Sequence, residues 1–446
     1  MFQTLRNAWK IEDLRKKILY TLFIVLIFRI GSAISVPFVD VDVMAQAVKD
    51  SGGIMDYLTM LSGGGFSDAS IFALSITPYI NASIVIQLLT VALPPLERLA
   101  KEGEAGRKKL AQITRYMTVV LGLLLGTAYY FMIRNNYQVL VSEARTGLGQ
   151  WFAAFVIVLC FAAGSAIVMW LGEQINERGL GNGISILLFA GIISRLPSAA
   201  RYLWAIFYEQ GVKMLDSGTG LKYVLIVPFI VILFLLIIMF IILITEGERR
   251  IPVQYAKRVV GRKLYGGQNT YIPIKVNMSG VMPIILAVSM VSVPSVIFRF
   301  TGAPEGKGFF GRIALFIYTV FSPNHPVYAV LYFLLIIGFA FFYVTIQYNP
   351  IEISNNLRKN SGAIPGYRPG KPTADYIKRV LNKITLVGAI CIGVIAIFPI
   401  IFSGVSGISG LALGGTSIMI VVGVALETTQ QLESQMMMRH YKGFLE

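Results

Sequence analysis

The run VLIVPFIVILFLLIIMFIILIT at residues 224–245 contains no charged side chain. A helix needs about 20 consecutive apolar residues to cross the roughly 30 Å hydrocarbon core of a bilayer, where lipid offers backbone groups no hydrogen-bond partners. This run therefore predicts a membrane-spanning helix. Similar stretches on either side of it predict ten spans in all, at 18–36, 71–93, 115–133, 151–171, 182–196, 222–245, 276–297, 328–348, 380–402 and 411–427.

The composition agrees with a chain that mostly contacts lipid. Hydrophobic residues make up 55% of the sequence, charged residues make up 14%, and the mean hydropathy is +0.69. A soluble chain of this length needs more polar surface, so an all-α integral membrane protein is expected. The formal net charge of +16 would favour nucleic-acid binding in a soluble domain. In a membrane protein, Lys and Arg in short loops instead orient the spans.

The distribution of Lys and Arg predicts that orientation. Segments on the side that holds both termini carry 28 of the 39 Lys and Arg residues, whereas the alternate loops, together with Arg195 at the end of the fifth span, carry ten. The remaining one, Arg29, lies inside the first span. Because cytoplasmic loops are enriched in Lys and Arg, we expect both termini to be cytoplasmic.

The sequence offers no constellation for catalysis or metal binding. Cys160 and Cys391 each lie in an apolar run without a Cys or His at metal-ligand spacing, and the chain has only two histidines. The segments GAPEGKG (302–308) and GYRPGKP (366–372) lack the glycine spacing and the Ser or Thr of a phosphate-binding loop. We therefore expect no catalytic residue, no cofactor and no metal, and the chain is predicted not to be an enzyme.

The interiors of the predicted spans are almost free of ionisable side chains. Ion-coupled transporters place ionisable or unwound sites near the bilayer midplane, so this pattern disfavours a carrier. A secondary transporter of small solutes nevertheless stays open as the alternative to a channel, as does a scaffold without a pore. Arg29, in the outer half of its span, is expected to have a structural role, by snorkelling or by bonding carbonyl groups.

Three segments on the cytoplasmic side are basic. Residues 1–17 predict an amphipathic helix on the membrane surface, and the loops 246–275 and 349–383 carry seven Lys and Arg residues each. Alternation in IPVQYAKRVV (251–260) predicts a hairpin strand. The loops could serve only to orient the chain, but short loops suffice for that purpose. Their length therefore favours a docking surface for a soluble partner.

The segment SGGIMDYLTMLSGGGFSDAS at 51–70 is too polar and too rich in glycine to span the bilayer. It is either an external loop or a short half-helix folded back into the protein, where backbone can be buried in protein or meet water. The composition leaves both interpretations open.

Eight phrases spread over most of the chain occur in an order that is typical of one known family. They are FRIGSAISVPFVD (28–40), LSGGGFSDASIFALSITPYINASIVIQLLT (61–90), KEGEAGRKKLAQITRY (101–116), MWLGEQINERGLGNGISILLFAGI (169–192), VQYAKR (253–258), IKVNMSGVMP (274–283), NNLRKNSGAIPGYRPGKPT (355–373) and GGTSIMIVV (414–422). By these phrases the sequence resembles the SecY family of protein-conducting channels.

The resemblance implies ten transmembrane helices in two pseudo-symmetric five-helix halves around a central pore. It implies a channel for unfolded secretory polypeptides that also releases membrane proteins sideways into lipid. The implied divisions are a cytoplasmic amphipathic helix (1–17), an N-terminal half (18–196) with a plug (54–66), an external hinge loop (197–222), a C-terminal half (222–427) with cytoplasmic loops (246–275 and 349–383), and a cytoplasmic tail (428–446).

The resemblance also assigns an apolar pore ring and a plug that closes it from outside. Branched aliphatic side chains form a constriction that water leaves readily, which blocks ions. The implied ring residues are Ile76, Ile80, Ile184, Leu188, Ile285 and Ile420. The implied plug residues are Ile54, Met55, Tyr57, Leu58, Met60 and Leu61.

A lateral gate and a docking site complete the implied machinery. Asn81, Gln87 and Asn277 match the gate, although the third span lacks an evident polar partner. The implied docking residues are Lys257, Arg258, Arg262, Lys263 and Arg368.

The resemblance further implies partners and a location. The partners are SecE-like and SecG-like small membrane subunits, the SecA motor ATPase or the ribosome as the energy source, and polypeptides that bear signal sequences. The residues in these phrases resemble the bacterial members of the family more than the archaeal ones. The protein is therefore expected to be a multi-pass protein of the bacterial cytoplasmic membrane.

Overall fold

A computed structural model of the whole chain provides the structure. It describes residues 2–51, 59, 62–134, 140–141, 148–205, 207–208, 212, 220–255, 258–260, 263–265, 269–301, 308–321, 325–406 and 414–442.

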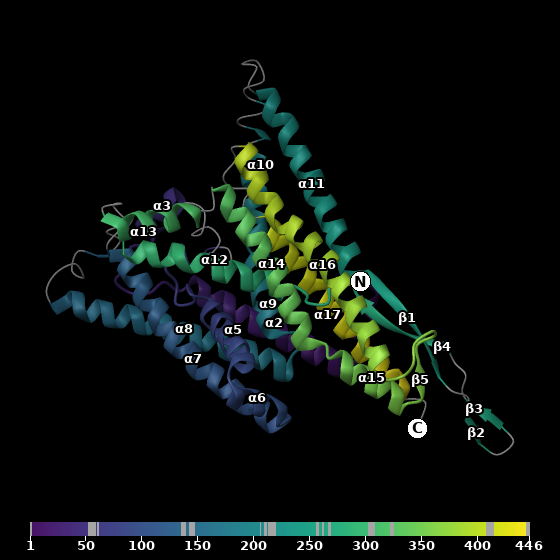
Figure 1. Cartoon of the computed structure of the whole chain (residues 1–446). Coiled ribbons are helices and arrows are strands. Elements are labelled where there is room, and N and C mark those ends of the chain that lie inside the picture. Colours follow the sequence, from purple (N-terminus) through teal and green to yellow (C-terminus); the bar gives the residue numbers. More distant parts are fainter. Residues whose placement is uncertain are drawn as a thin grey trace.

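Long helices make up most of the described chain (Figure 1). The first part of the chain forms α1 (Phe2–Trp9), α2 (Glu12–Ala33), α3 (Val41–Ser51), α5 (Thr77–Ala92), α6 (Pro94–Lys101), α7 (Glu104–Met132), α8 (Leu148–Arg178), α9 (Gly183–Ile193) and α10 (Leu196–Ala205). The second part forms α11 (Gly220–Glu246), α12 (Met282–Thr301), α13 (Gly308–Val320), α14 (Pro326–Gln347), α15 (Pro350–Lys359), α16 (Lys371–Ser406) and α17 (Gly414–Lys442).

Every predicted span coincides with a helix. By length and hydropathy, six helices among the described residues could cross a membrane, or seven if α5 and α6, bent by 101°, form one span. The other three predicted spans coincide with α2, α12 and α17, which this criterion does not count. The fifth span extends beyond its predicted end, because α10 continues from α9 into the predicted hinge loop.

The helices pack in two groups that follow the chain order. Contacts join α2, α5, α7, α8 and α9 in the first group, and α11, α12, α14, α16 and α17 in the second. The two groups touch where α9 meets α17 and where α7 meets α12. Helix α1 also packs on α17, through a small core that buries Ala8, Leu14, Leu180 and Leu432.

A small antiparallel sheet adds to the helical body. Its strands are β1 (Glu248–Tyr255), β4 (Asn269–Lys275) and β5 (Gly362–Ala363), in the order β4-β1-β5. A hairpin of β2 (Arg258–Val260) and β3 (Lys263–Tyr265) lies beyond it (Figure 1). The predicted hairpin strand is confirmed. Because β1 pairs with both β4 and β5, the loops 246–275 and 349–383 contribute to one sheet, which the sequence did not predict.

Candidate functional site

One apolar cluster joins the two helix groups. It contains the six ring residues, which come from α9, α12, α17 and the start of α5. Ile76, Leu188 and Ile420 are 1–2% exposed, and the other three are half-buried against them. The structure thus brings together side chains that lie far apart in the sequence.

Local structure positions the ring residues of the first group. The Ile80 amide donates to the Ile76 carbonyl at 3.0 Å, so the two side chains follow each other on one helical turn. At the start of α9, the Asn182 side chain accepts from the Ile184 amide at 3.1 Å, which caps the helix at the turn that carries Ile184. Ile184 and Leu188 then share one face of α9.

The neighbours of the ring are also aliphatic. A Cβ placed on Gly172 of α8 would lie 3.7 Å from Ile76 Cδ1 and 3.8 Å from Ile184 Cγ1, so α8 comes close to both. Val281 and Val424 also belong to the cluster, although the resemblance did not assign them to the ring. Such a surface offers a passing ion nothing to replace its water shell.

The three predicted gate residues do not form a network in the described residues. Asn277 is 7% exposed, and its Oδ1 has no hydrogen-bond partner. Asn81 is half-buried, and Gln87 is exposed and donates to Ser83 one turn back in its own helix at 3.4 Å. Helix α7, the third predicted span, nevertheless contacts α12, the seventh, and this contact forms a seam between the two helix groups.

Of the predicted plug, Ile54, Met55, Tyr57, Leu58, Met60 and Leu61 lie outside the described residues. The residues that follow are held by Arg29 of α2. Its Nη1 donates to the Gly63 carbonyl at 3.1 Å and to Ser194 Oγ at 2.9 Å. The expectation that Arg29 bonds a carbonyl group is therefore confirmed.

Of the five predicted docking residues, Arg368 is the one whose side chain the described part of the chain includes. Arg368 is exposed on a turn between Gly366 (φ +84°) and Gly370 (φ +106°), and its carbonyl accepts from Thr373 Oγ1 at 2.8 Å. Only glycine adopts such backbone angles readily, so the turn is built into the sequence. Lys257 and Arg262 lie outside the described residues, as do the side chains of Arg258 and Lys263 in the hairpin.

The sheet rests on a core of its own, to which both loops contribute. Ile251 and Val253 of β1 pack with Leu357 of α15, Ile364 and Leu381. On the exposed side, Arg250 donates to Glu248 at 2.6 Å and lies 4.7 Å above the Tyr271 ring. The hydrogen bond to Glu248 raises the pKa of the Arg250 guanidinium. Because Arg249 of β1 and Lys275 of β4 are also exposed, the sheet carries more positive than negative side chains.

A repeated geometry at α5 and α12 was missed from the sequence. Both helices begin six residues inside their predicted spans and have a proline, Pro78 or Pro283, as their second residue. Seven residues before each proline, a carbonyl faces a glycine of a neighbouring helix. Ile71 faces Gly164 of α8, and Val276 faces Gly388 of α16. The shared spacing of seven in IFALSITP and VNMSGVMP was the available signal.

A family model for SecY matches residues 70–429. The chain belongs to the SecY family. A SecY protein translocase subunit of Streptomyces galbus is 43% identical over the full length of both chains, and one of Mycobacterium bovis is 40% identical, also over the full length. The resemblance that the sequence phrases carried is confirmed.

Solved channels share the fold of this SecY-family chain. A structure described as showing how the SecY plug domain stabilises the closed translocation channel has a TM-score of 0.62 and 18% identity, and covers 94% of this chain and 92% of its own. Sec61 in a canine ribosome-channel complex has a TM-score of 0.59 and 16% identity, with the same coverage. The chain is thus a protein-conducting channel subunit, and the alternative of a small-solute transporter finds no support.

Proposed function

We propose that this channel moves unfolded secretory polypeptides across the bacterial cytoplasmic membrane, and releases membrane proteins sideways between α7 and α12. The observation that carries the proposal is the convergence of six branched aliphatic side chains in one cluster between the two helix groups. A chain passing there is held without specific bonds, while ions are excluded because the constriction is dry. Residues 54–66 seal the outside, and Asn81, Gln87 and Asn277 line the sideways exit.

Energy comes from a soluble partner on the cytoplasmic sheet, either a SecA-like motor or the ribosome. One of the solved relatives is described as a ribosome-channel complex, which supports this class of partner. The basic sheet and the exposed Arg368 fit a partner with carboxylate or phosphate groups, because the planar guanidinium pairs with both in bidentate fashion. SecE-like and SecG-like subunits complete the assembly in the bilayer.

Conversion of Ile80 and Ile285 together to Asn tests the ring. Hydrogen-bonding side chains let a water column persist, so the resting ion current across a planar bilayer should rise. Conversion of both residues to Val is the control and should leave the channel as tight as the parent. Both variants are compared with and without residues 54–61. A double Asn variant that stays tight even after the deletion would show that the cluster is ordinary packing.

Arg368→Glu tests the docking site. The turn lies outside the helical body, so the fold should be retained, while a carboxylate at the tip repels an acidic partner. Translocation of a precursor into inverted vesicles, with motor and ATP present, should be lost. Lys359→Glu makes the same charge change on exposed α15 and should retain most of the activity. Equal rates for Arg368→Glu and the parent would remove Arg368 from the docking site.

A further inference from the structure

The segment Ser62–Phe72 begins within the proposed seal (54–66) and leads to α5. It has no regular secondary structure, yet most of its side chains are buried. Buried irregular backbone is costly unless its polar groups are paired. The partners that pair them show to which helices the segment is attached.

Arg29 makes the first attachment. Its Nη1 joins the Gly63 carbonyl to Ser194 Oγ, and so links α2 and the end of α9 to the segment. A guanidinium inside a predicted span forms stronger hydrogen bonds than a neutral donor, and leaving it unpaired there is costly. Gly63 sits at φ +64°, where the Arg29 side chain occupies the space that a Cβ would need.

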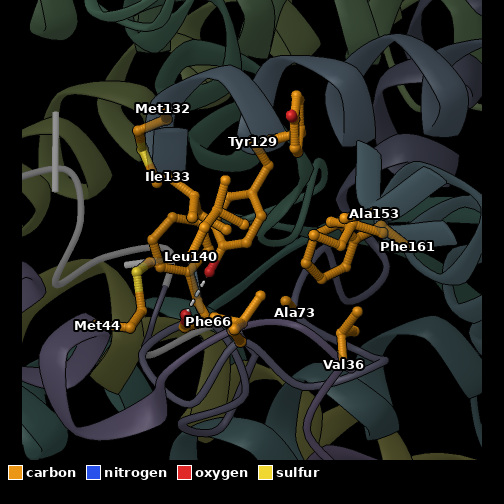
Figure 2. Close-up of a cluster of buried hydrophobic side chains, with 14 residues drawn as sticks. Val36, Met44, Phe66, Ala73, Tyr129, Met132, Ile133, Leu140, Ala153 and Phe161 are labelled. Atoms are coloured by element: carbon orange, nitrogen blue, oxygen red, sulfur yellow. Dashed lines mark hydrogen bonds between the residues drawn. The ribbon is translucent and has the colours of Figure 1, made fainter. Parts of the chain in front are cut away.

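Tyr129 of α7 makes the second attachment (Figure 2). Its hydroxyl donates to the Phe66 carbonyl at 2.6 Å, and its ring meets the Phe66 ring edge-on, with 4.6 Å between centroids. The Tyr129 ring also meets Phe161 of α8 at 4.7 Å. Figure 2 shows Phe66, Tyr129 and Phe161 within one buried cluster that also contains Met44 and Val36.

The third attachment is a short backbone ladder to the residues that follow α2. The Val36 amide donates to the Ala69 carbonyl, and the Ile71 amide donates to the Ile34 carbonyl, both at 2.9 Å. Ser35 and Ser70 form the antiparallel bridge between these two bonds. Thr59 belongs to the same unit, because its carbonyl accepts from the Gly64 amide at 2.8 Å and from Ser62 Oγ at 3.1 Å.

We propose that Thr59 and residues 62–72 are a fixed anchor that keeps its place against α2, α7 and the end of α9 while the channel opens, and that Arg29 is its positioning residue. The proposal rests on the proposed function in taking channel opening as the event. It narrows that function, because residues 62–66 were included in the seal and are here assigned to the anchor. Three separate attachments must break together for the anchor to shift.

A disulfide between positions 35 and 70 tests whether the anchor moves. Opposed residues of an antiparallel bridge have Cα atoms about 4.5–5.5 Å apart, which suits a disulfide. Ser35→Cys with Ser70→Cys, in a chain whose Cys160 and Cys391 are replaced by Ala, should form the bond on oxidation, as seen by mass spectrometry of the linked peptides. Translocation of a precursor should then continue at the rate of the reduced channel.

Two results of this experiment would overturn the proposal. If translocation by this variant stops on oxidation and restarts with reductant, the anchor must move during opening, and the proposal is wrong. Failure of the two cysteines to form a bond means that the bridge does not exist. Deletion of residues 54–58 in the parent tests the proposed seal separately. If that deletion leaves the resting current unchanged, the seal is wrong, while the disulfide result still reports on the anchor.

Substitution of Arg29 tests its positioning role. Arg29→Met removes both hydrogen bonds, so the anchor can leave its place in the resting channel, and the resting ion current should rise about tenfold, which corresponds to the loss of one charged hydrogen bond. Arg29→Lys keeps a charged donor and should restore most of the seal. If Arg29→Met does not fold, Ser194→Ala removes one of the two acceptors, and a smaller rise in resting current is expected. A variant that folds and stays as tight as the parent would show that Arg29 only supports the fold.

Discussion

The residues that lead into α5 and those that lead into α12 share one construction and differ in what holds them. In both, a carbonyl packs on a glycine of a later helix, and a proline follows seven residues on and starts the helix. The segment before α5 (62–76), which is predicted to be external, is tied to its neighbours by Arg29, by Tyr129 and by the backbone ladder. The segment before α12 (276–281), which is predicted to be cytoplasmic, continues directly from β4.

Among the described residues, fewer hydrogen bonds hold the cytoplasmic segment. The Val276 amide donates to the Gly247 carbonyl at 2.8 Å, whereas Asn277 Oδ1 is buried without a partner in that part of the chain. The external segment also has one such atom, Ser70 Oγ, but its main chain is bonded on three sides. The same arrangement of carbonyl, glycine and proline thus leads into both helices. The segment before α5 combines it with the proposed anchor, whereas the segment before α12 connects it directly to strand β4.

Accessibility gives the largest expected contrast, because the two segments should face opposite sides of the membrane. A single cysteine at Gln46, exposed on α3, should react with an impermeant thiol reagent in intact cells. A cysteine at Tyr271 of β4, which is 49% exposed, should react only after the cells are opened. Each cysteine is introduced into a variant in which Cys160 and Cys391 are replaced by Ala. The reverse pattern of labelling would invert the topology that the charge distribution predicts.

The two packing glycines should differ in their tolerance of alanine. A Cβ on Gly164 would meet three atoms of Ile71 within 3.0 Å, so Gly164→Ala should cost about 3 kcal/mol of folding free energy or more. A Cβ on Gly388 meets only the Val276 carbonyl oxygen closely, and that segment has fewer ties, so about 1–2 kcal/mol is expected.

Thermal unfolding in detergent measures this contrast. Gly338→Ala in α14 is the control, because nothing lies within 4 Å of its Cβ position and alanine favours a helix. Equal losses for Gly164→Ala and Gly388→Ala would show that the two segments are held equally.

Two neighbouring tyrosines allow a matched test of the external anchor. Tyr129→Phe removes the bond to the Phe66 carbonyl and should destabilise the channel by about 1 kcal/mol. Tyr130→Phe removes a buried hydroxyl that has no partner in the described residues, so the same change should be neutral or stabilising. If thermal unfolding ranks the two variants the other way, the Tyr129 bond does not hold the anchor.

Asn277→Leu should have the smallest effect on stability, and it should stabilise the channel, whereas Tyr129→Phe and the glycine substitutions destabilise it. Removal of a buried oxygen without a partner should stabilise the closed channel by up to about 1 kcal/mol, and translocation of a precursor should slow because the seam opens less readily. Ser70→Ala removes the corresponding oxygen of the anchor and should leave the translocation rate unchanged. An unaltered rate for Asn277→Leu would take Asn277 out of the gate.

The sequence alone determined where the helices lie and to which family the chain belongs. Hydropathy is a local property, since an apolar stretch that crosses lipid forms a helix whatever its neighbours are. The exceptions are the first six residues of the spans at α5 and α12, which lie before the helices begin. The stretch 224–245 therefore predicted α11 within a few residues. The same holds for the turn around Arg368, where glycine and proline restrict the backbone directly. Arg29 was also predicted correctly, because a charged group in a span must find a partner.

Only the tertiary structure decided which distant residues meet. Arg29 and Ser194 are 165 positions apart, and the pairing of β1 with β5 joins loops that the sequence separates by two spans. The ring residues looked like any aliphatic side chain in a span until four elements placed them in one cluster. Periodicity and composition report on a single element, whereas these contacts depend on how the elements pack against one another.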